Sequence, residues 1–296
     1  PRRGDLVPTL VGVLEAGGAY VGLAAAYPAA RLAWILSDAS VEVVVTTAEQ
    51  AGVLPAGAWT TLLVEDLLAE DATTDDSTTD DSEALAPVHP AQLAYLVYTS
   101  GSPGRPKGVA LTHGAAAALQ VWAAGTFPAT GPVAGPVAAV TSVCFDLSVF
   151  ALFTPLATGG CVVLLADALA LATAPERHRV ALVNTVPSAA EALLEGGGLP
   201  RSGRGVNLAG EALSQALVER LYAESEVVQV RDLYGPSEDT TYSTWAERTG
   251  GGRAQIGRPV WGTQAYVVDG SGGLVPSGVV GELYLGGASL ARGYWG

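Results

Sequence analysis

The sequence predicts an α/β fold of mostly parallel sheets with flanking helices, plus a small antiparallel β-subdomain at its C-terminal end. Short apolar or β-branched runs, such as 41–46 and 61–64, alternate with helix-like segments. Several of these runs are apolar throughout, which is typical of strands covered on both faces. From Thr263 the pattern changes, because apolar runs are joined there by a Gly/Ser turn. The alternation indicates βα units, and the later change indicates hairpins.

The expected elements follow one another along the chain. A short helix begins near Pro8 and ends before Gly17-Gly18, since Pro favours helix starts and Gly favours helix ends. Residues 265–268 and 282–285 are predicted to pair as a hairpin across a turn at 270–273. The other strands are expected at 19–23, 41–46, 61–64, 93–98, 137–143, 161–165, 181–185, 206–208 and 227–230, with helices between them.

We divide the chain into an α/β part, residues 1–262, and the start of a β-barrel-like subdomain, residues 263–296. Residues 70–90 are rich in Asp, Ser and Thr and lack apolar periodicity, so we expect a mobile acidic loop there rather than an acidic binding tail. The chain contains no Met and stops directly after a glycine-rich apolar stretch. We therefore expect a piece of a longer polypeptide.

Composition narrows the classes of partner. The 296 residues are 49% apolar and 15% charged, with a formal net charge of -14, so a general basic field for nucleic acid or anionic lipid is missing. The longest apolar runs fall short of the ~20 residues of a membrane helix. Two cysteines, Cys144 and Cys161, are predicted to be buried thiols, and together with the lack of a leader-like segment they favour the cytoplasm. His and Cys show no metal-binding spacing.

A candidate phosphate loop follows the strand expected at 93–98. The segment Tyr98-Thr-Ser-Gly-Ser-Pro-Gly-Arg-Pro-Lys-Gly108 offers hydroxyls, flexible backbone N–H groups and one cation, all of which bind polyphosphate. A plain turn would use similar residues. In a Walker loop Gly-Lys-Ser/Thr opens a helix, whereas here Arg105-Pro106 separates Gly104 from Lys107. An ordinary P-loop ATPase is therefore disfavoured.

This loop, with the strand before it, resembles the signature loop of the adenylate-forming superfamily, particularly the adenylation domains of nonribosomal peptide synthetases. Pro103 stands where that family usually has Thr. Further segments resemble the family's other motifs, in the family's order and over nearly the whole chain. They are 14–21 (where Gly22 and Ala24 then replace the usual Pro and Asp), 144–148, 208–212, 233–238, 281–287 and 291–295.

The resemblance implies ATP and Mg²⁺ as cofactors. It makes Lys107 and Glu238 catalytic, assigns Glu238 to Mg²⁺, and stacks the Tyr234 ring on adenine. Without the resemblance, the plain alternative for Tyr234 is a residue that anchors a turn, and for Glu238 a solvated acid in a loop. The residues implied in nucleotide binding are Thr99, Ser100, Gly101, Ser102, Gly104, Lys107, Gly210, Glu211, Tyr234, Gly235 and Ser237.

Asp146 is the residue that points to an amino-acid substrate. It begins a helical stretch, so a helix N-cap is the plain alternative. In the family the matching Asp pairs with the substrate ammonium, and a fatty or aryl acid would leave that carboxylate unpaired. The family's specificity positions fall on Asp146, Leu147, Phe150, Asn184, Asn207, Ala209, Leu233, Thr241 and Tyr242.

This set suggests a small substrate side chain. Phe150, Leu233 and Tyr242 are bulky and are expected to fill the base of the pocket, and the set offers no second carboxylate or base for a charged side chain. By resemblance alanine is favoured, with glycine and serine next, although pockets discriminate one methylene by only ~1–3 kcal/mol.

The implied activity is ATP-dependent formation of aminoacyl-AMP, followed by loading onto the phosphopantetheine thiol of a peptidyl carrier domain in the parent chain. A small activator protein is a further conceivable partner. The family's small C-terminal lobe with its catalytic Lys falls beyond Gly296, so this chain alone is expected to be slow or inactive. An acyl- or aryl-CoA ligase of the same superfamily and a catalytically silent scaffold domain remain alternatives.

Overall fold

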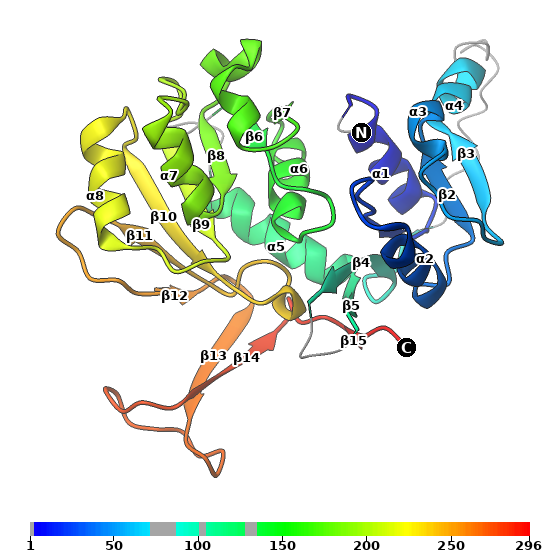
Figure 1. Ribbon diagram of the computed structural model, residues 1–296. Coiled ribbons are helices and arrows are strands. Elements are labelled where there is room, and N and C mark those ends of the chain that lie inside the picture. Colours follow the sequence, from blue (N-terminus) through cyan, green and yellow to red (C-terminus); the bar gives the residue numbers. More distant parts are fainter. Residues whose placement is uncertain (1–2, 72–86, 101–104, 128–134) are drawn as a thin grey trace.

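The chain folds as an α/β protein of sheets flanked by helices, as the sequence predicts (Figure 1). The structure, a computed structural model, describes residues 3–71, 87–100, 105–127 and 135–296. Most of the expected acidic loop (72–86), and Gly101, Ser102 and Gly104 of the phosphate loop, lie outside these ranges.

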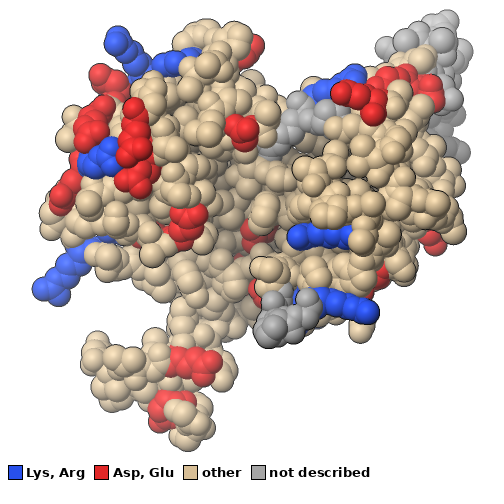
Figure 2. Space-filling model, in the orientation of Figure 1, with Lys and Arg blue, Asp and Glu red and all other residues tan. Residues whose placement is uncertain are grey.

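In Figure 2 the surface is hollowed between the two halves of the molecule, and Lys and Arg side chains are scattered among acidic ones.

A seven-stranded sheet forms the larger half, with the order β12-β11-β10-β9-β8-β6-β7. The five strands from β7 to β10 run parallel to one another, whereas β11 is antiparallel to both of its neighbours, β10 and β12. The bounds are β6 Val137–Ala139, β7 Val162–Leu164, β8 Leu182–Thr185, β9 Gly205–Ala209, β10 Gln229–Tyr234, β11 Thr244–Arg248 and β12 Arg258–Pro259.

Helices cover this sheet on both faces, which explains why its central strands are apolar throughout. On one face α5 (His113–Thr126) and α6 (Leu147–Ala157) pack against a cluster that includes Leu182 of β8. On the other, α7 (Pro187–Glu195) and α8 (Gln215–Glu224) pack against a cluster that includes Val183, the next residue of that strand. Successive side chains of a strand point to opposite faces, so both clusters share the same strands.

The N-terminal half holds a second sheet of order β1-β4-β5-β15 and a parallel pair, β2 and β3. Its strands are β1 Tyr20–Val21, β2 Val43–Thr46, β3 Thr60–Leu63, β4 Leu93–Thr99, β5 Lys107–Thr112 and β15 Gly293–Tyr294. Its helices are α1 Leu6–Glu15, α2 Ala29–Asp38, α3 Ala48–Ala51 and α4 Val64–Asp71. Three short 3₁₀ segments elsewhere are η1 Leu169–Ala172, η2 Pro175–Arg179 and η3 Ser237–Asp239. No helix in the described ranges is long and apolar enough to cross a membrane.

α-Helices lie between the predicted strands, except between β7 and β8, where the structure has only the 3₁₀ segments η1 and η2, and strands β5 and β11 were not predicted. The segment after the phosphate loop opens with β5, which runs antiparallel to β4, so that Lys107 lies opposite Thr99. Strand β11 likewise pairs antiparallel to β10. Both strands fold back on the strand before them, and β5 is then followed directly by α5, the helix expected before β6.

The predicted hairpin near the C-terminal end is confirmed. Strand β13 (Thr263–Val268) pairs antiparallel with β14 (Glu282–Gly287), and the pair extends away from both larger sheets in Figure 1.

The prediction of two buried thiols is right for Cys144 and wrong for Cys161, which is exposed. Cys161 immediately precedes β7, and β7 is the last strand at one edge of the large sheet. An edge strand has a neighbour on only one side, which leaves its flanking residue open to solvent.

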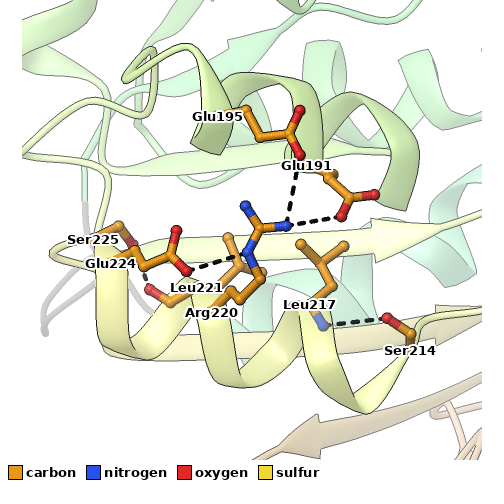
Figure 3. A network of polar contacts seen from close by, with 8 residues as sticks. All are labelled: Glu191, Glu195, Ser214, Leu217, Arg220, Leu221, Glu224 and Ser225. Atoms are coloured by element: carbon orange, nitrogen blue, oxygen red, sulfur yellow. Dashed lines mark hydrogen bonds and ion pairs between the residues drawn. The ribbon is translucent and has the colours of Figure 1, made fainter.

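Arg220 connects the two helices on the outer face, as Figure 3 shows. Its Nη1 lies 2.9 Å from Glu191 Oε1 and 3.7 Å from Glu195 Oε1, both on α7, and its Nε lies 3.2 Å from Glu224 Oε1 on α8. The side chains of this group are partly exposed, so water screens the attraction between them.

A second ion pair lies in the interior, directly before the candidate nucleotide loop. Arg248 Nη1 on β11 lies 2.5 Å from Asp232 Oδ2 on β10, and the Arg248 side chain is only 1% exposed. Arg248 Nη2 also donates to Gln215 Oε1 on α8 at 3.0 Å. Burial raises the pKa of Asp232, while the Arg248 guanidinium acts in the opposite direction. The pair therefore ties two strands and a helix together at the base of the loop that follows β10.

We predict that Arg248→Ala lowers the free energy of unfolding by about 3–5 kcal/mol, because it leaves the Asp232 carboxylate buried without its cation. The matched control is Arg220→Ala, whose screened contacts should give a much smaller loss. Urea unfolding of both variants measures this, and equal losses would contradict the assignment of the larger role to Arg248.

Candidate nucleotide and amino-acid site

The predicted site segments lie at one edge of the large sheet. Asp146 follows β6, Asn184 lies near the end of β8, Gly210 follows β9, and Gly235 follows β10. These four strands are parallel, so their carboxyl ends share one edge. In open α/β sheets ligands bind at that edge.

Asp146 is buried, with 6% of its surface exposed. It occupies the N-cap position of α6, but its side chain makes no capping hydrogen bond, so the plain N-cap alternative gains no support. No ion pair among the described residues involves Asp146. Within the described ranges its carboxylate thus has no charged partner.

Burial is the largest influence on the Asp146 carboxyl group and raises its pKa. The Ser237 hydroxyl and the backbone N–H of Leu147 lower the pKa, whereas the nearby negative charge of Glu238 raises it further. A bound ammonium group would offset the cost of burying this charge.

Hydrogen bonds connect several of the predicted substrate residues. Thr241 Oγ1 donates to the Asp146 main-chain oxygen at 3.0 Å across 95 residues of sequence. Tyr242 Oη donates to Asn184 Oδ1 at 2.8 Å, and Asn184 Nδ2 donates to the Leu147 main-chain oxygen at 3.4 Å. The start of α6, strand β8 and the loop after β10 are thus held in one arrangement.

The loop that supplies Thr241 has an unusual backbone. Thr240 and Thr241 have φ angles of 47° and 74°, a region that non-glycine residues rarely adopt. Both are buried, and the Thr240 hydroxyl donates to the main-chain oxygen of Ser289. Strain of this kind persists where surrounding contacts enforce it, and it is concentrated at binding sites.

The bulky members of the predicted set lie together. The ring centres of Phe150 and Tyr242 are 5.7 Å apart, and neither residue is exposed. Leu233, also buried, belongs to the same core cluster. Phe127 packs against Phe150 with ring centres 5.0 Å apart. The structure thus brings these side chains together behind Asp146, and their contact with substrate stays a prediction.

Strand β9 adds Asn207 and Ala209 on the face that carries Asn184. Asn184 lies opposite Asn207 in the sheet register, and Asn207 lies opposite Arg231. Asn207 is completely buried, and both polar atoms of its amide lack a hydrogen-bond partner within the described part of the chain.

The sequence analysis missed Arg231. It is 4% exposed, its guanidinium carbon lies 4.4 Å from the centre of the Phe127 ring, and burial lowers its pKa. The signal was in the sequence, because Arg231 precedes Leu233 by two positions and strand residues two apart face the same side.

On the nucleotide side, β4 and β5 place the two ends of the phosphate loop opposite each other. Thr99 is partly buried and Ser100 exposed at the end of β4, and Lys107 is exposed at the start of β5. The Lys107 Nζ atom lies 4.9 Å from the centre of the Tyr294 ring.

The loop after β10 holds the other predicted nucleotide residues. Tyr234 is 40% exposed, and its stacking on a base stays a prediction. A Cβ atom at Gly235 would lie 2.7 Å from the Thr241 main-chain oxygen, so only glycine fits there. Glu238 Oε1 accepts a hydrogen bond from Tyr294 Oη at 2.6 Å.

Gly210 and Glu211, the two other residues predicted to bind the nucleotide, lie directly after β9. Gly210 adopts a φ of 82°, which favours glycine at this turn after β9. Both carboxylate oxygens of Glu211 accept hydrogen bonds from Ser188, one from its backbone N–H at 3.0 Å and one from its hydroxyl at 2.8 Å. Glu211 thus caps the start of α7, and its role toward nucleotide stays a prediction.

The site fits Mg²⁺ held chiefly through ATP. No group of three or more His, Cys, Asp or Glu side chains in the described ranges is placed to hold a metal ion. Glu238 offers a single carboxylate. Mg²⁺ usually keeps several waters and binds through one or two carboxylates plus substrate phosphates, so one carboxylate suffices.

The comparisons with known proteins decide the family. Residues 1–295 match the family described as AMP-binding enzyme. The chain belongs to the AMP-binding enzyme family. Among curated relatives of this family, it is 43% identical over 297 residues to a linear gramicidin synthase of Brevibacillus parabrevis, covering 99% of the chain and 6% of that protein. It is 44% identical to the AMB antimetabolite synthetase AmbB of Pseudomonas aeruginosa, covering 100% of the chain and 23% of that protein.

Solved AMP-binding structures share the fold over nearly the whole chain. One is the four-domain nonribosomal peptide synthetase holo-AB3403 bound to AMP and glycine, with a TM-score of 0.83, 29% identity, and coverage of 99% of this chain and 21% of that one. Another is the synthetase FmoA3 in its α-methyl-L-serine-AMP bound form, with a TM-score of 0.83, 27% identity, and coverage of 99% and 33%. The chain thus spans a minor part of each relative and is homologous to their adenylation domains.

We predict that Asp146→Asn stabilises the ligand-free chain at neutral pH, because it removes a buried charge. The raised pKa of Asp146 means that wild type loses stability as pH rises from below the unfolded pKa of about 4 through the folded value. Urea unfolding from pH 3 to pH 8 should show the variant gaining over wild type as pH rises, with little difference at pH 3. A variant less stable than wild type at neutral pH would contradict this.

Proposed function

We propose that this chain binds MgATP and an α-amino acid and activates the amino acid as aminoacyl-AMP. The observation that carries the proposal is the buried Asp146 carboxylate, which has no ion-pair partner among the described residues and lies beside the loop that carries Glu238. A carboxylate in such a place favours a substrate with an ammonium group over a fatty or aryl acid.

The chemistry requires alignment more than proton transfer. A substrate carboxylate oxygen forms a bond to the α-phosphorus of ATP while the bond to the pyrophosphate oxygen breaks. Thr99, Ser100 and Lys107 hold phosphate, and Asp146 orients the amino group. Mg²⁺, held by Glu238 and the phosphates, would neutralise charge on the leaving pyrophosphate. Tyr234 stacks on the base.

We favour a small amino acid, with alanine first. Phe150 and Tyr242 are bulky, fully buried and in contact with each other, and we infer that they limit the length of the substrate side chain. Two structural relatives add support, since one is bound to AMP and glycine and the other to α-methyl-L-serine-AMP. Arg231 does not change this preference, because its guanidinium lies over Phe127 rather than beside Asp146 in the described contacts.

The acceptor we propose is the phosphopantetheine thiol of a carrier domain, and the synthetase relatives support this. The thiol sulfur would form a thioester with the acyl carbon, and AMP would leave.

We keep the division of the chain into an α/β part, residues 1–262, and the start of a further subdomain, residues 263–296. The hairpin of β13 and β14 supports this division, because it begins at Thr263.

We predict that a synthetase containing this chain catalyses ATP–pyrophosphate exchange with alanine faster than with other amino acids. Asp146→Ala should reduce that exchange by at least about 10²-fold, since the ammonium loses its counter-charge in a dry pocket. Thr9→Ala, on α1, serves as a distant control. Exchange driven by aryl or fatty acids instead would favour the CoA-ligase alternative.

Calorimetry on the isolated chain separates the scaffold alternative from the enzyme. An alanyl-sulfamoyl adenosine analogue should bind the chain, and Asp146→Ala should weaken that binding. No binding of either the analogue or ATP would favour a domain that keeps the fold without the chemistry.

A further inference from the structure

Residues 288–295 connect the two halves of the candidate ATP site. On one side, the Trp295 backbone N–H donates to the Gly108 oxygen at 2.7 Å and that of Arg292 to the Ala110 oxygen at 2.8 Å, so the segment joins strand β5. On the other side, the Ala291 backbone N–H donates to the main-chain oxygen of Glu238 at 2.8 Å. One short segment thus holds both the Lys107 strand and the Glu238 loop.

Buried side chains strengthen the second attachment. Ser289 Oγ donates to Asp239 Oδ1 at 2.6 Å, and a hydrogen bond of 2.8 Å joins the hydroxyls of Ser289 and Thr263. Ser289 is 3% exposed and Asp239 1% exposed. Hydrogen bonds in such a dry environment fix position strongly, so the loop after β10 has little freedom to move away from this segment.

Tyr294 is the one side chain in this segment that contacts both predicted catalytic residues. Its hydroxyl donates to Glu238 Oε1 at 2.6 Å, and its ring lies under the Lys107 ammonium, 4.9 Å from the ring centre. Strand β15 holds the backbone of Tyr294, which lies opposite Val109 in the register with β5.

Resting on the proposed function, we propose that Tyr294 is a positioning residue that sets the Glu238 carboxylate for Mg²⁺ and the Lys107 ammonium for phosphate. The phenol donates to one carboxylate oxygen of Glu238, which would leave the other oxygen to bind the metal. The ring restrains the flexible lysine side chain by a cation–π contact. Without Tyr294, both groups would have to be ordered by ATP itself, which weakens binding.

The test is ATP binding to the chain by calorimetry over a range of Mg²⁺ concentrations. Tyr294→Phe removes only the hydroxyl. The Mg²⁺ concentration at which half of the Mg²⁺-dependent increase in ATP affinity is reached should therefore rise by about threefold to tenfold. Binding without Mg²⁺ should stay unchanged. Tyr294→Leu also removes the ring and should weaken Mg²⁺-free ATP binding by roughly twofold to fivefold.

Two controls separate positioning from folding. Tyr284→Phe changes a tyrosine of similar exposure on β14, 53% against 54%, and should behave as wild type. In a Glu238→Ala background the Tyr294→Phe change should have no further effect on Mg²⁺ dependence, because its partner is gone. Equal melting temperatures of wild type and Tyr294→Phe verify the fold.

A Mg²⁺ dependence of Tyr294→Phe within twofold of wild type would overturn the inference while leaving the proposed function intact. Equal weakening with and without Mg²⁺ would also overturn it, since it would indicate a general loss of structure. If wild type itself bound no ATP, the proposed function and the inference would fall together.

Discussion

Asp146 brings a carboxylate into the interior at the sheet edge where the predicted site segments meet. It is almost fully buried, and no Lys or Arg in the described ranges pairs with it. A protein interior tolerates such a group only where a ligand offsets the cost, or where the group serves a purpose that outweighs it. The surrounding hydrogen bonds hold neighbouring backbone in place and supply no positive charge.

The fold provides this arrangement through its topology. Parallel strands β6, β8, β9 and β10 send their carboxyl ends to one edge, so residues far apart in sequence become neighbours there. The antiparallel strand β11 then returns from that edge, and the buried Arg248–Asp232 pair fastens it to β10. The loop between them, residues 235–243, is thus held at both ends, and the hydrogen bonds of Thr240 and Thr241 to Ser289 and Asp146 explain how their rare backbone angles persist.

Much of this could be predicted from the sequence, because parallel strands covered on both faces leave a strong signal of apolar runs. Strand β5 was missed because it follows the phosphate loop directly and pairs with the strand before it, so no alternation marks it. Arg231 and Tyr294 were missed for another reason. Local signals existed, since Arg231 faces the same side as Leu233 and Tyr294 lies in the motif-like segment 291–295. The importance of each, however, depends on a contact with a residue distant in sequence, Phe127 and Glu238 respectively.

The central claim is that the buried Asp146 carboxylate receives the ammonium group of an amino acid. A crystal structure of the chain with alanyl-sulfamoyl adenosine tests this most directly. The account predicts the alanyl nitrogen at ~2.7–3.2 Å from an Asp146 carboxylate oxygen, the distance of a charge-assisted hydrogen bond. An analogue bound with that nitrogen in solvent, or with Asp146 turned away from it, would contradict the account.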